Sequence, residues 1–316
     1  MVRAYFSPGW LLPMNSASRL GPTGWRGTSD SSPHLRLRSQ RLTFDLSIKQ
    51  KENGSNMIHP RIISGSRFGR FLARHARGYL DYYRNVENYD MARNGERWLL
   101  TRAAKIFQGR KICVFDVGAN YGEWSRIAMD LLPQAHIYAF EMIPEFQEAV
   151  RSLEQGGRLT MLPFGLSDQQ AEREVFRVGG GGKMIPNPFS KKKPEPVRAL
   201  LTTADEVMRE HALTNVEMVK IDTDGHEIAV LAGMAHTLAT RPPSIIQFEY
   251  SRYTLLHRYY LKDAYDLLGS HGYKIGRLLP KGVAFAKYKW LDEDFRSSNF
   301  VAARGPDLIK DLRCRF

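Results

Sequence analysis

Apolar and polar positions along this chain form a repeating pattern of short apolar runs and longer amphipathic segments. The first apolar run, 112–116, leads into a glycine-containing loop, and an amphipathic segment follows over 123–132. A short apolar run bounded by turn residues predicts a buried strand, whereas apolar residues three and four positions apart predict a helix. Because the pattern recurs to about residue 303, the sequence predicts alternating strands and helices.

The predicted elements define the fold class. Strands are expected over 112–116, 136–141, 158–163, 172–178, 216–222, 244–250, 272–277, 283–288 and 299–303. Helices are expected over 123–132, 144–154, 203–211, 227–239 and 260–269. Strands that alternate with helices form a mostly parallel central sheet with helices on both faces. Short loops join the last strands, which we therefore expect to be antiparallel. The result is an α/β, Rossmann-like fold.

The region before the first strand is predicted to be helical. Between residues 65 and 108, apolar side chains recur at helical spacing, and Arg67, Arg70, Arg74 and Arg77 share another face. A second helix is expected to end at Gly109. We interpret residues 57–110 as a helical cap on the sheet, 111–305 as the main domain and 306–316 as a C-terminal tail.

Positive charge is concentrated at the N-terminus. The net charge is +13, and residues 1–110 contain 19 Lys or Arg against 7 Asp or Glu, whereas residues 111–316 contain 27 against 26. Residues 1–56 show no periodicity and are interpreted as a disordered basic extension. An arm for nucleic acid or an anionic surface, an organelle transit peptide, and a true start at Met57 are alternatives.

Two further compositional features bear on location. The two cysteines, Cys113 and Cys314, cannot form a disulfide framework and are typical of a reducing compartment. No apolar run approaches the 18 residues or so of a membrane span. We therefore expect a cytoplasmic protein without a membrane span.

The loop after the first strand carries the clearest functional signal. Gly118 and Gly122 allow the backbone to approach a ligand at the carboxyl end of the strand, although a tight turn alone would also use them. The spacing is not G-x-G-x-x-G, and Asp116 would repel a pyrophosphate. These residues favour S-adenosylmethionine over a dinucleotide. Asp116 and Asn120 are candidates for binding it, or for capping the next helix.

Two more carboxylates end predicted strands. Glu141 follows the second strand and is suited to accept hydrogen bonds from ribose hydroxyls. Asp168 follows the third strand and is a candidate partner of the adenine amino group, or a turn residue. With Asp116, Gly118, Asn120 and Gly122, they form the expected cofactor site.

Acidic residues also cluster after the fourth strand. Asp222, Asp224, His226 and Glu227 lie where α/β sheets bind ligands. A metal site is conceivable there, but Gly225 indicates a turn, and we expect no metal. Glu249 ends the fifth strand and must be paired or functional if it is buried.

The order of these motifs resembles the FkbM family of S-adenosylmethionine-dependent methyltransferases. The resemblance covers about residues 110–303. It rests on Asp116-Val-Gly-Ala-Asn-Tyr-Gly122, Phe140-Glu141, Gly165-Leu-Ser-Asp168, Val219-Lys-Ile-Asp-Thr-Asp-Gly-His-Glu227, Val230-Leu-Ala-Gly233 and Ile246-Gln-Phe-Glu249. Where the family commonly has Glu, this chain has Asp224. The resemblance implies a Rossmann-like methyltransferase fold and a hydroxyl of a glycan or secondary metabolite as acceptor.

The expected activity is therefore O-methylation of a small molecule or glycan. A hydroxyl acceptor must lose its proton, and His226 is the candidate base, with Asp222 or Glu249 orienting it or the acceptor. One alternative is an RNA methyltransferase that uses the basic N-terminal arm, although we consider a nucleic-acid partner unlikely. Others are a non-catalytic nucleotide-binding member and, less favoured by the glycine pattern, a nicotinamide dehydrogenase. The sequence does not indicate an oligomeric state.

Overall fold

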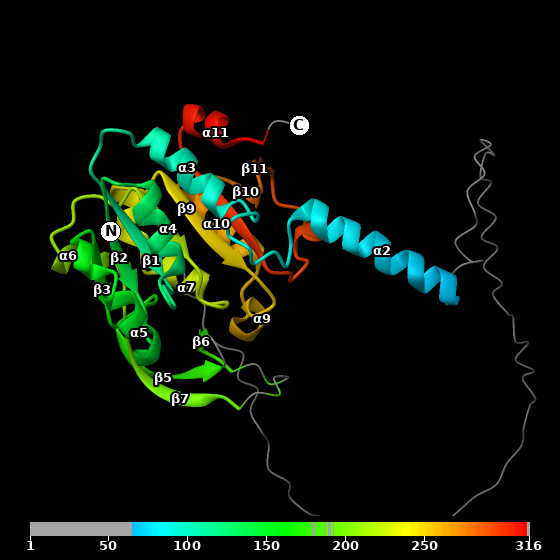
Figure 1. The fold of residues 1–316 in the computed structure, drawn as a ribbon, viewed down its shortest axis with the longest axis horizontal. Coiled ribbons are helices and arrows are strands. Elements are labelled where there is room, and N and C mark those ends of the chain that lie inside the picture. Colours follow the sequence, from blue (N-terminus) through cyan, green and yellow to red (C-terminus); the bar gives the residue numbers. More distant parts are fainter. Residues whose placement is uncertain (1–64, 179–180, 187, 189–190, 192, 315–316) are drawn as a thin grey trace, which may run out of the picture. The chain divides into compact units, whose positions relative to one another are not determined.

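The computed structural model describes residues 65–178, 181–186, 188, 191 and 193–314, and its centre is a mixed β-sheet (Figure 1). Within the described residues this sheet has eight strands in the order β11-β10-β12-β9-β8-β1-β2-β3. The basic extension predicted over 1–56 lies outside the described residues. The predicted strands between 112 and 303 are confirmed, with shifts of a few residues at their ends.

Five strands of the central sheet are parallel. They are β1 (Ile112–Val117), β2 (Ala135–Phe140), β3 (Leu159–Leu162), β8 (Met218–Ile221) and β9 (Ile245–Tyr250). The remaining three, β12 (Ser298–Ala303), β10 (Lys274–Leu279) and β11 (Gly282–Phe285), are antiparallel to their neighbours. The predicted fold class, mostly parallel with antiparallel last strands, is therefore confirmed.

Both faces of the sheet are covered, because alternate side chains of each buried strand point to opposite faces. In β1, Phe115 and Val117 pack into one core cluster and Ile112 and Val114 into the other. The first cluster includes residues of α6 (Ala204–Glu210), α7 (Glu227–Ala232), α8 (Ala235–Thr240) and α10 (Leu261–Ser270). The second includes residues of α3 (Glu96–Ile106), α4 (Glu123–Leu131) and α11 (Pro306–Leu312).

Two predictions about helices are wrong in detail. The single helix expected over 227–239 is divided into α7 and α8 around Gly233 and Met234. A Cβ at Gly233 would lie 1.9 Å from the carbonyl oxygen of Ser167, so the chain passes this point in close backbone contact. In addition, the segment 306–316, expected to be a tail, contains α11, and Leu312 of that helix is fully buried.

A second, smaller sheet adjoins α5 (Pro144–Arg151). Its strands β4 (Gly165–Leu166), β7 (Glu195–Thr202), β5 (Ala171–Val178) and β6 (Gly181–Lys183) pair in that order. Its small core joins Ile143 and Phe146 to Val175 and Ala199. Strand β7 was not predicted, because Pro196 and its exposed polar residues weaken the alternating pattern by which a strand is identified.

The predicted N-terminal cap is only partly a cap. Helix α3 packs on the sheet through Leu99, Leu100 and Ala103, which are fully buried. Helix α2 (Arg67–Arg84), in contrast, has no buried residue, and so the expectation that it packs before the sheet is wrong. Its apolar residues have helical spacing and are exposed, and their ring contacts, Phe71 with His75 and Tyr79 with Tyr83, lie within α2 itself.

The segment between α2 and α3 is tied to the sheet edge by Asn85. This residue ends α2 in the left-handed conformation, with φ of 55°, and is buried. Its side-chain amide donates hydrogen bonds to the carbonyl oxygens of Asn94, at 2.7 Å, and of Leu278 in β10, at 3.0 Å.

We expect Asn85→Ala to lower the free energy of unfolding by about 2–4 kcal/mol, since it leaves two buried carbonyls without a donor and places alanine at positive φ. Denaturation by urea, followed by circular dichroism, measures the loss. Asn85→Gly is the matched control, because glycine accepts the left-handed conformation and loses only the hydrogen bonds. Equal stability of the wild type and both variants would contradict this account.

Candidate functional site

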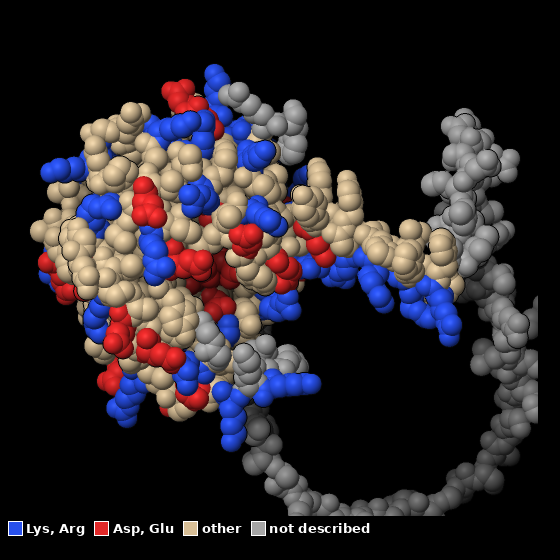
Figure 2. Space-filling view, viewed as in Figure 1, with Lys and Arg blue, Asp and Glu red and all other residues tan. Residues whose placement is uncertain are grey.

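The candidate site is a cavity at the carboxyl ends of β1, β2, β8 and β9. In the sheet, β2 and β3 lie on one side of β1, and β8 and β9 lie on the other. The strand order therefore reverses at β1, and a crevice opens between the loops that follow β1 and β8. The cavity measures about 430 Å³. Figure 2 shows that acidic side chains gather in a hollow of the molecular surface, where Lys and Arg are few.

The loop after β1 forms one wall. Gly118 has φ of 81°, and a Cβ there would lie 2.0 Å from the carbonyl oxygen of Asp222, so only glycine lets the loop lie against the end of β8. Gly122 has φ of 76° and packs against Leu153 in the same way. The backbone N–H groups of Gly118 and Ala119 donate to the carbonyl oxygen of Phe140. Gly118, Asn120 and Gly122 are thus held at the position predicted for them.

Glu141 holds this loop to the end of β2. One carboxylate oxygen accepts a hydrogen bond from the backbone N–H of Asn120 and the other from that of Ile143, both at 2.8 Å. Burial raises the pKa of Glu141, while these hydrogen bonds partly oppose the increase. The carboxylate lies in the cavity wall, where its remaining lone pairs can accept from a ligand hydroxyl.

Asp116 lies beneath the loop and does not line the cavity. It is fully buried, accepts a hydrogen bond from the Ser125 hydroxyl at 2.6 Å and forms an ion pair with Lys220 at 3.5 Å. The binding of a ligand by Asp116 stays a prediction. In the structure, Asp116 holds α4 through Ser125 and compensates part of the charge of Lys220.

Lys220 is a site residue that the sequence pattern did not single out. It projects from β8 and is almost completely buried, with Asp222 at 3.4 Å and Asp116 at 3.5 Å. Burial by itself lowers the pKa of an amine, but Asp222, Asp116 and Glu96 outweigh it and raise the pKa of Lys220. The ammonium is consequently charged and offsets part of the acidity of the site.

The turn after β8 presents Asp222 and Asp224 to the cavity. Asp224 adopts positive φ of 54° and pairs at 2.7 Å with Lys183, which comes from β6 and lies 3.7 Å from the centre of the Tyr253 ring. Burial raises the pKa of Asp224, and Lys183 opposes the increase. This ion pair connects the small sheet to the β8 turn, a connection that sequence spacing alone could not indicate.

Glu227 shapes that turn rather than facing a ligand. One of its oxygens accepts hydrogen bonds from the backbone N–H groups of Thr223 and Gly225 and from the Thr223 hydroxyl. The other oxygen is buried without a hydrogen bond among the described residues. Burial therefore raises the pKa of Glu227 to about 7, against the lowering by the turn N–H groups.

Glu249, at the end of β9, lines the cavity beside Ser297 and Asn299. Its pKa is raised well above the ordinary value, first by burial and then by the nearby carboxylates Asp222 and Asp224. Its environment therefore favours the neutral form of the Glu249 carboxyl group more than water does. The prediction that this residue is placed in the site is supported by the geometry.

His226 stands between the main cavity and a smaller recess. It lines both, and the recess also contains Asp168, Ser167 and His257. Its Nε2 lies 3.0 Å from the Ser167 hydroxyl, and its Nδ1 lies 3.5 Å from Nδ1 of His257. Burial and His257 lower the pKa of His226 to about 4. Asp168 is thus outside the main cavity, and its contact with adenine stays a prediction.

Several neutral polar residues complete the cavity. Asn88, Tyr89 and Asn94 come from the segment before α3, while Ser297, Ser298 and Asn299 come from the start of β12. Sequence reasoning missed them, because they lie far in sequence from the glycine loop and outside any motif. Their hydroxyl and amide groups can donate and accept hydrogen bonds. Within the described part of the chain, no group of three or more His, Cys, Asp or Glu is arranged to hold a metal ion.

Comparison with known proteins bears on the identity of this site. A family model described as the methyltransferase FkbM domain matches residues 116–275, which include the glycine loop, Glu141, the β8 turn and Glu249. A search of curated proteins returned no match.

Solved structures similar to the chain include several methyltransferases. The precorrin-6y C5,15-methyltransferase from Geobacter metallireducens is 14% identical, with 66% of this chain and 87% of that chain covered and a TM-score of 0.38. The plantazolicin methyltransferase BpumL, in complex with SAH, is 11% identical, with 78% and 95% covered and a TM-score of 0.38. A SAM dependent methyltransferase from Aquifex aeolicus is 11% identical, with 78% and 98% covered and a TM-score of 0.36.

Glu227 generates a prediction about pH and stability. Its pKa rises from 4.5 in the unfolded chain to about 7 in the folded protein. Between these pH values the folded protein binds one proton more than the unfolded chain does. This residue therefore destabilises the fold progressively as pH rises from 4.5 to 7. Glu227→Gln keeps the accepting oxygen and cannot ionise. We expect its free energy of unfolding, relative to wild type, to increase by about 2–3 kcal/mol between pH 4.5 and pH 8.

Urea denaturation at a series of pH values measures this difference. The exposed Glu172→Gln serves as the control, whose difference from wild type should stay constant. A pH-independent difference for Glu227→Gln would show that Glu227 ionises normally in the folded protein.

Proposed function

This chain belongs to the FkbM methyltransferase family, and from that premise we propose that it methylates a hydroxyl group of a glycan or secondary metabolite. The methyl donor is S-adenosylmethionine, which supplies an electrophilic methyl group on a sulfonium. The observation that carries the proposal is the composition of the cavity: carboxylates lie around the loops after β1, β2 and β8, and neutral amide and hydroxyl groups occupy the side formed by residues 88–94 and 297–299.

The carboxylate side fits the donor. A cation is favoured where Glu141, Asp222 and Asp224 are close together, and a phosphate is repelled. Gly118, Asn120 and Gly122 leave room beside the backbone, and Glu141 can accept hydrogen bonds from ribose hydroxyls. We propose these four residues, with Asp168 at the adenine end and Asp116 as the buried support beneath, as the cofactor site.

The neutral side fits a polyhydroxylated acceptor. Asn88, Asn299 and the hydroxyl of Ser297 line this side and can pair with acceptor hydroxyls. Asn94 and Ser298 form hydrogen bonds within the protein and brace the same wall. These residues would orient the acceptor oxygen toward the donor, which is the main task in a displacement reaction. Phosphate-rich RNA is a poorer match because the cavity is acidic, and therefore we retain RNA methylation only as an alternative.

We propose His226 as the base that takes the acceptor proton. With a pKa of about 4, its imidazole is neutral at physiological pH, and one of its two ring nitrogens carries the lone pair that a base needs. Ser167 and His257 fix the ring, and Asp222 and Glu249, on the same cavity wall, orient the acceptor.

We further propose that residues 111–305 form the catalytic domain and that the protein works in the cytoplasm. The match over 116–275 supports the domain, and Cys113 and Cys314, both free thiols, support the compartment.

Binding of S-adenosylhomocysteine by calorimetry tests the cofactor site. We expect the wild type to bind S-adenosylhomocysteine and not NAD. Glu141→Ala should bind S-adenosylhomocysteine at least tenfold more weakly, because the loop loses its carboxylate anchor and the site loses its ribose acceptor. The surface variant Glu172→Ala should bind like wild type. Thermal denaturation confirms that each variant is folded. Normal affinity in folded Glu141→Ala would remove this residue from the site.

The pH dependence of turnover tests the base, once a panel of hydroxylated acceptors has yielded a substrate. Since the neutral imidazole is available above pH 5, kcat/KM governed by His226 should stay level from pH 8 to about 5 and fall only toward pH 4. His226→Ala should lower kcat by about 10²–10⁴ with S-adenosylhomocysteine binding unchanged. The exposed histidine variant His236→Ala is the control. Undiminished turnover in His226→Ala would discard the base role.

A further inference from the structure

Helix α2 exposes a continuous apolar stripe. Phe68, Phe71, Leu72, Tyr79 and Tyr83 are 46–68% exposed, and Tyr82 is 87% exposed. At about 100° per residue these positions fall on one half of the helix circumference. Large apolar side chains grouped in this way mark a contact surface rather than scattered surface residues.

The opposite half of the helix is basic. Arg67, Arg70, Arg74, Arg77 and Arg84 all project from it, and the one acidic residue of α2 is Asp81. Figure 2 shows Lys and Arg along one side of α2 and uncharged residues along the other. Because Asp81 is paired with Arg296, at 3.0 Å, the arginines have no carboxylate partner within α2 itself.

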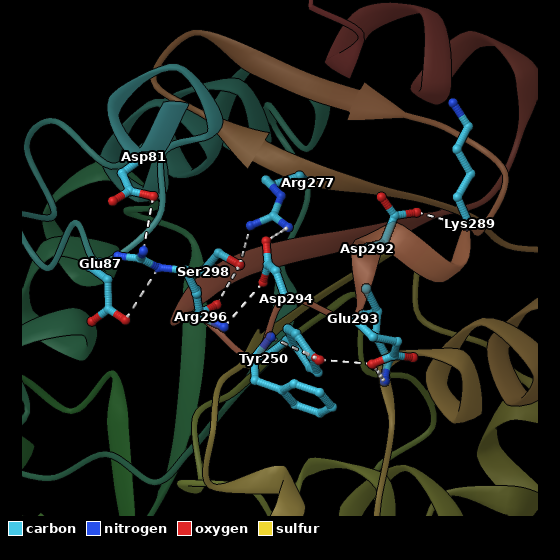
Figure 3. Close-up of polar contacts among 12 residues, drawn as sticks. Asp81, Glu87, Tyr250, Arg277, Lys289, Asp292, Glu293, Asp294, Arg296 and Ser298 are labelled. Carbon is cyan, nitrogen blue, oxygen red and sulfur yellow. Dashed lines mark hydrogen bonds and ion pairs between the residues drawn. The ribbon is translucent and has the colours of Figure 1, made fainter. Parts of the chain in front are cut away.

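The C-terminal end of α2 is fixed to the rest of the protein. Arg296 contacts both Asp81 and Glu87, as Figure 3 shows, and the backbone N–H of Glu87 donates to the carbonyl oxygen of Ser297 at 2.7 Å. The apolar stripe is not used in this attachment. A rigid base and an uncovered apolar face are what a helix needs to bring the protein to another surface.

We propose that α2 is an interfacial helix that binds the surface of an anionic lipid bilayer. An apolar face of Phe, Leu and Tyr opposite an arginine face, with low overall hydrophobicity, is characteristic of helices that lie in the headgroup region. Aromatic side chains are favoured at that depth, and arginines bind anionic headgroups. No helix described by the structure is long and apolar enough to span a bilayer, so binding is peripheral.

The charge of α2 favours lipid over a second copy of the chain. Two helices paired through their apolar stripes would leave all ten arginines on the outer faces without an anionic partner, since the aspartate of each helix already pairs with Arg296. An anionic surface, in contrast, neutralises the same arginines. RNA would engage the arginines but leave the aromatic stripe in water. This inference is independent of the methyl acceptor.

Vesicle flotation of the full chain tests the proposal. We expect binding to vesicles of phosphatidylcholine with about 30 mol% phosphatidylserine, weakened by salt, and much weaker binding to pure phosphatidylcholine. The triple variant Phe68→Ser, Phe71→Ser, Tyr79→Ser should lose at least tenfold in binding. Replacement of Arg70, Arg74 and Arg77 by Gln should lower binding to anionic vesicles on the order of a hundredfold.

The matched control is Leu200→Ser, an exposed apolar residue of β7 that should bind vesicles like wild type. All variants should keep wild-type S-adenosylhomocysteine affinity, because α2 does not line the cavity. Wild-type protein that stays off anionic vesicles overturns the proposal. So does vesicle binding that the α2 variants leave unchanged. If the wild type does not bind vesicles, and light scattering shows a wild-type dimer that dissociates in the triple variant, a second copy of the chain is the partner of the apolar stripe instead.

Discussion

The burial of the Lys220 ammonium between the carboxylates at the ends of β1 and β8 is the interaction on which the site depends. An unpaired charge in this position would cost several kcal/mol, and so would an unpaired carboxylate at the fully buried Asp116. Asp116 and Asp222, 3.5 and 3.4 Å away, and Glu96 at the start of α3 compensate the ammonium. Strand β1 can therefore carry the buried Asp116 near its end, while Asp222 after β8 lines the cavity, where a cationic ligand can reach it.

Lys220 and Lys183 do not compensate every acid of the site, and the remaining carboxyl groups shape its electrostatics. Burial raises the pKa of Glu141, Glu227 and Glu249, and the mutual repulsion of neighbouring carboxylates adds to the effect at Glu249. His226, placed next to a second histidine, shifts in the opposite direction and stays neutral. Burial and spacing thus raise the pKa values of the buried glutamates and lower that of the histidine, so the site combines carboxyl groups with a neutral imidazole.

Prediction from sequence succeeded where the residues that cause a structure lie in the same short segment as the pattern that indicates it. The strands of the main sheet, the loop Gly118–Gly122 and the carboxylate Glu141 are of this kind, since apolar runs and positive-φ glycines act locally. It failed where the cause lies elsewhere in the chain. Gly233, between α7 and α8, lies against the carbonyl of Ser167, which is distant in sequence, and α2 has no buried residue although its own pattern is amphipathic.

The sequence by itself therefore determined the α/β fold, the family and the places where acidic residues end strands, because these follow from periodicity and from motifs of a few residues. Only the tertiary structure decided which of those residues face the ligand. Asp116 turned toward Ser125 and Lys220, Asp168 fell in a neighbouring recess, and Lys183, Asn94 and Asn299 entered or braced the site from distant segments. Side-chain direction and long-range pairing depend on how strands and loops pack in three dimensions, and local pattern carries no record of that packing.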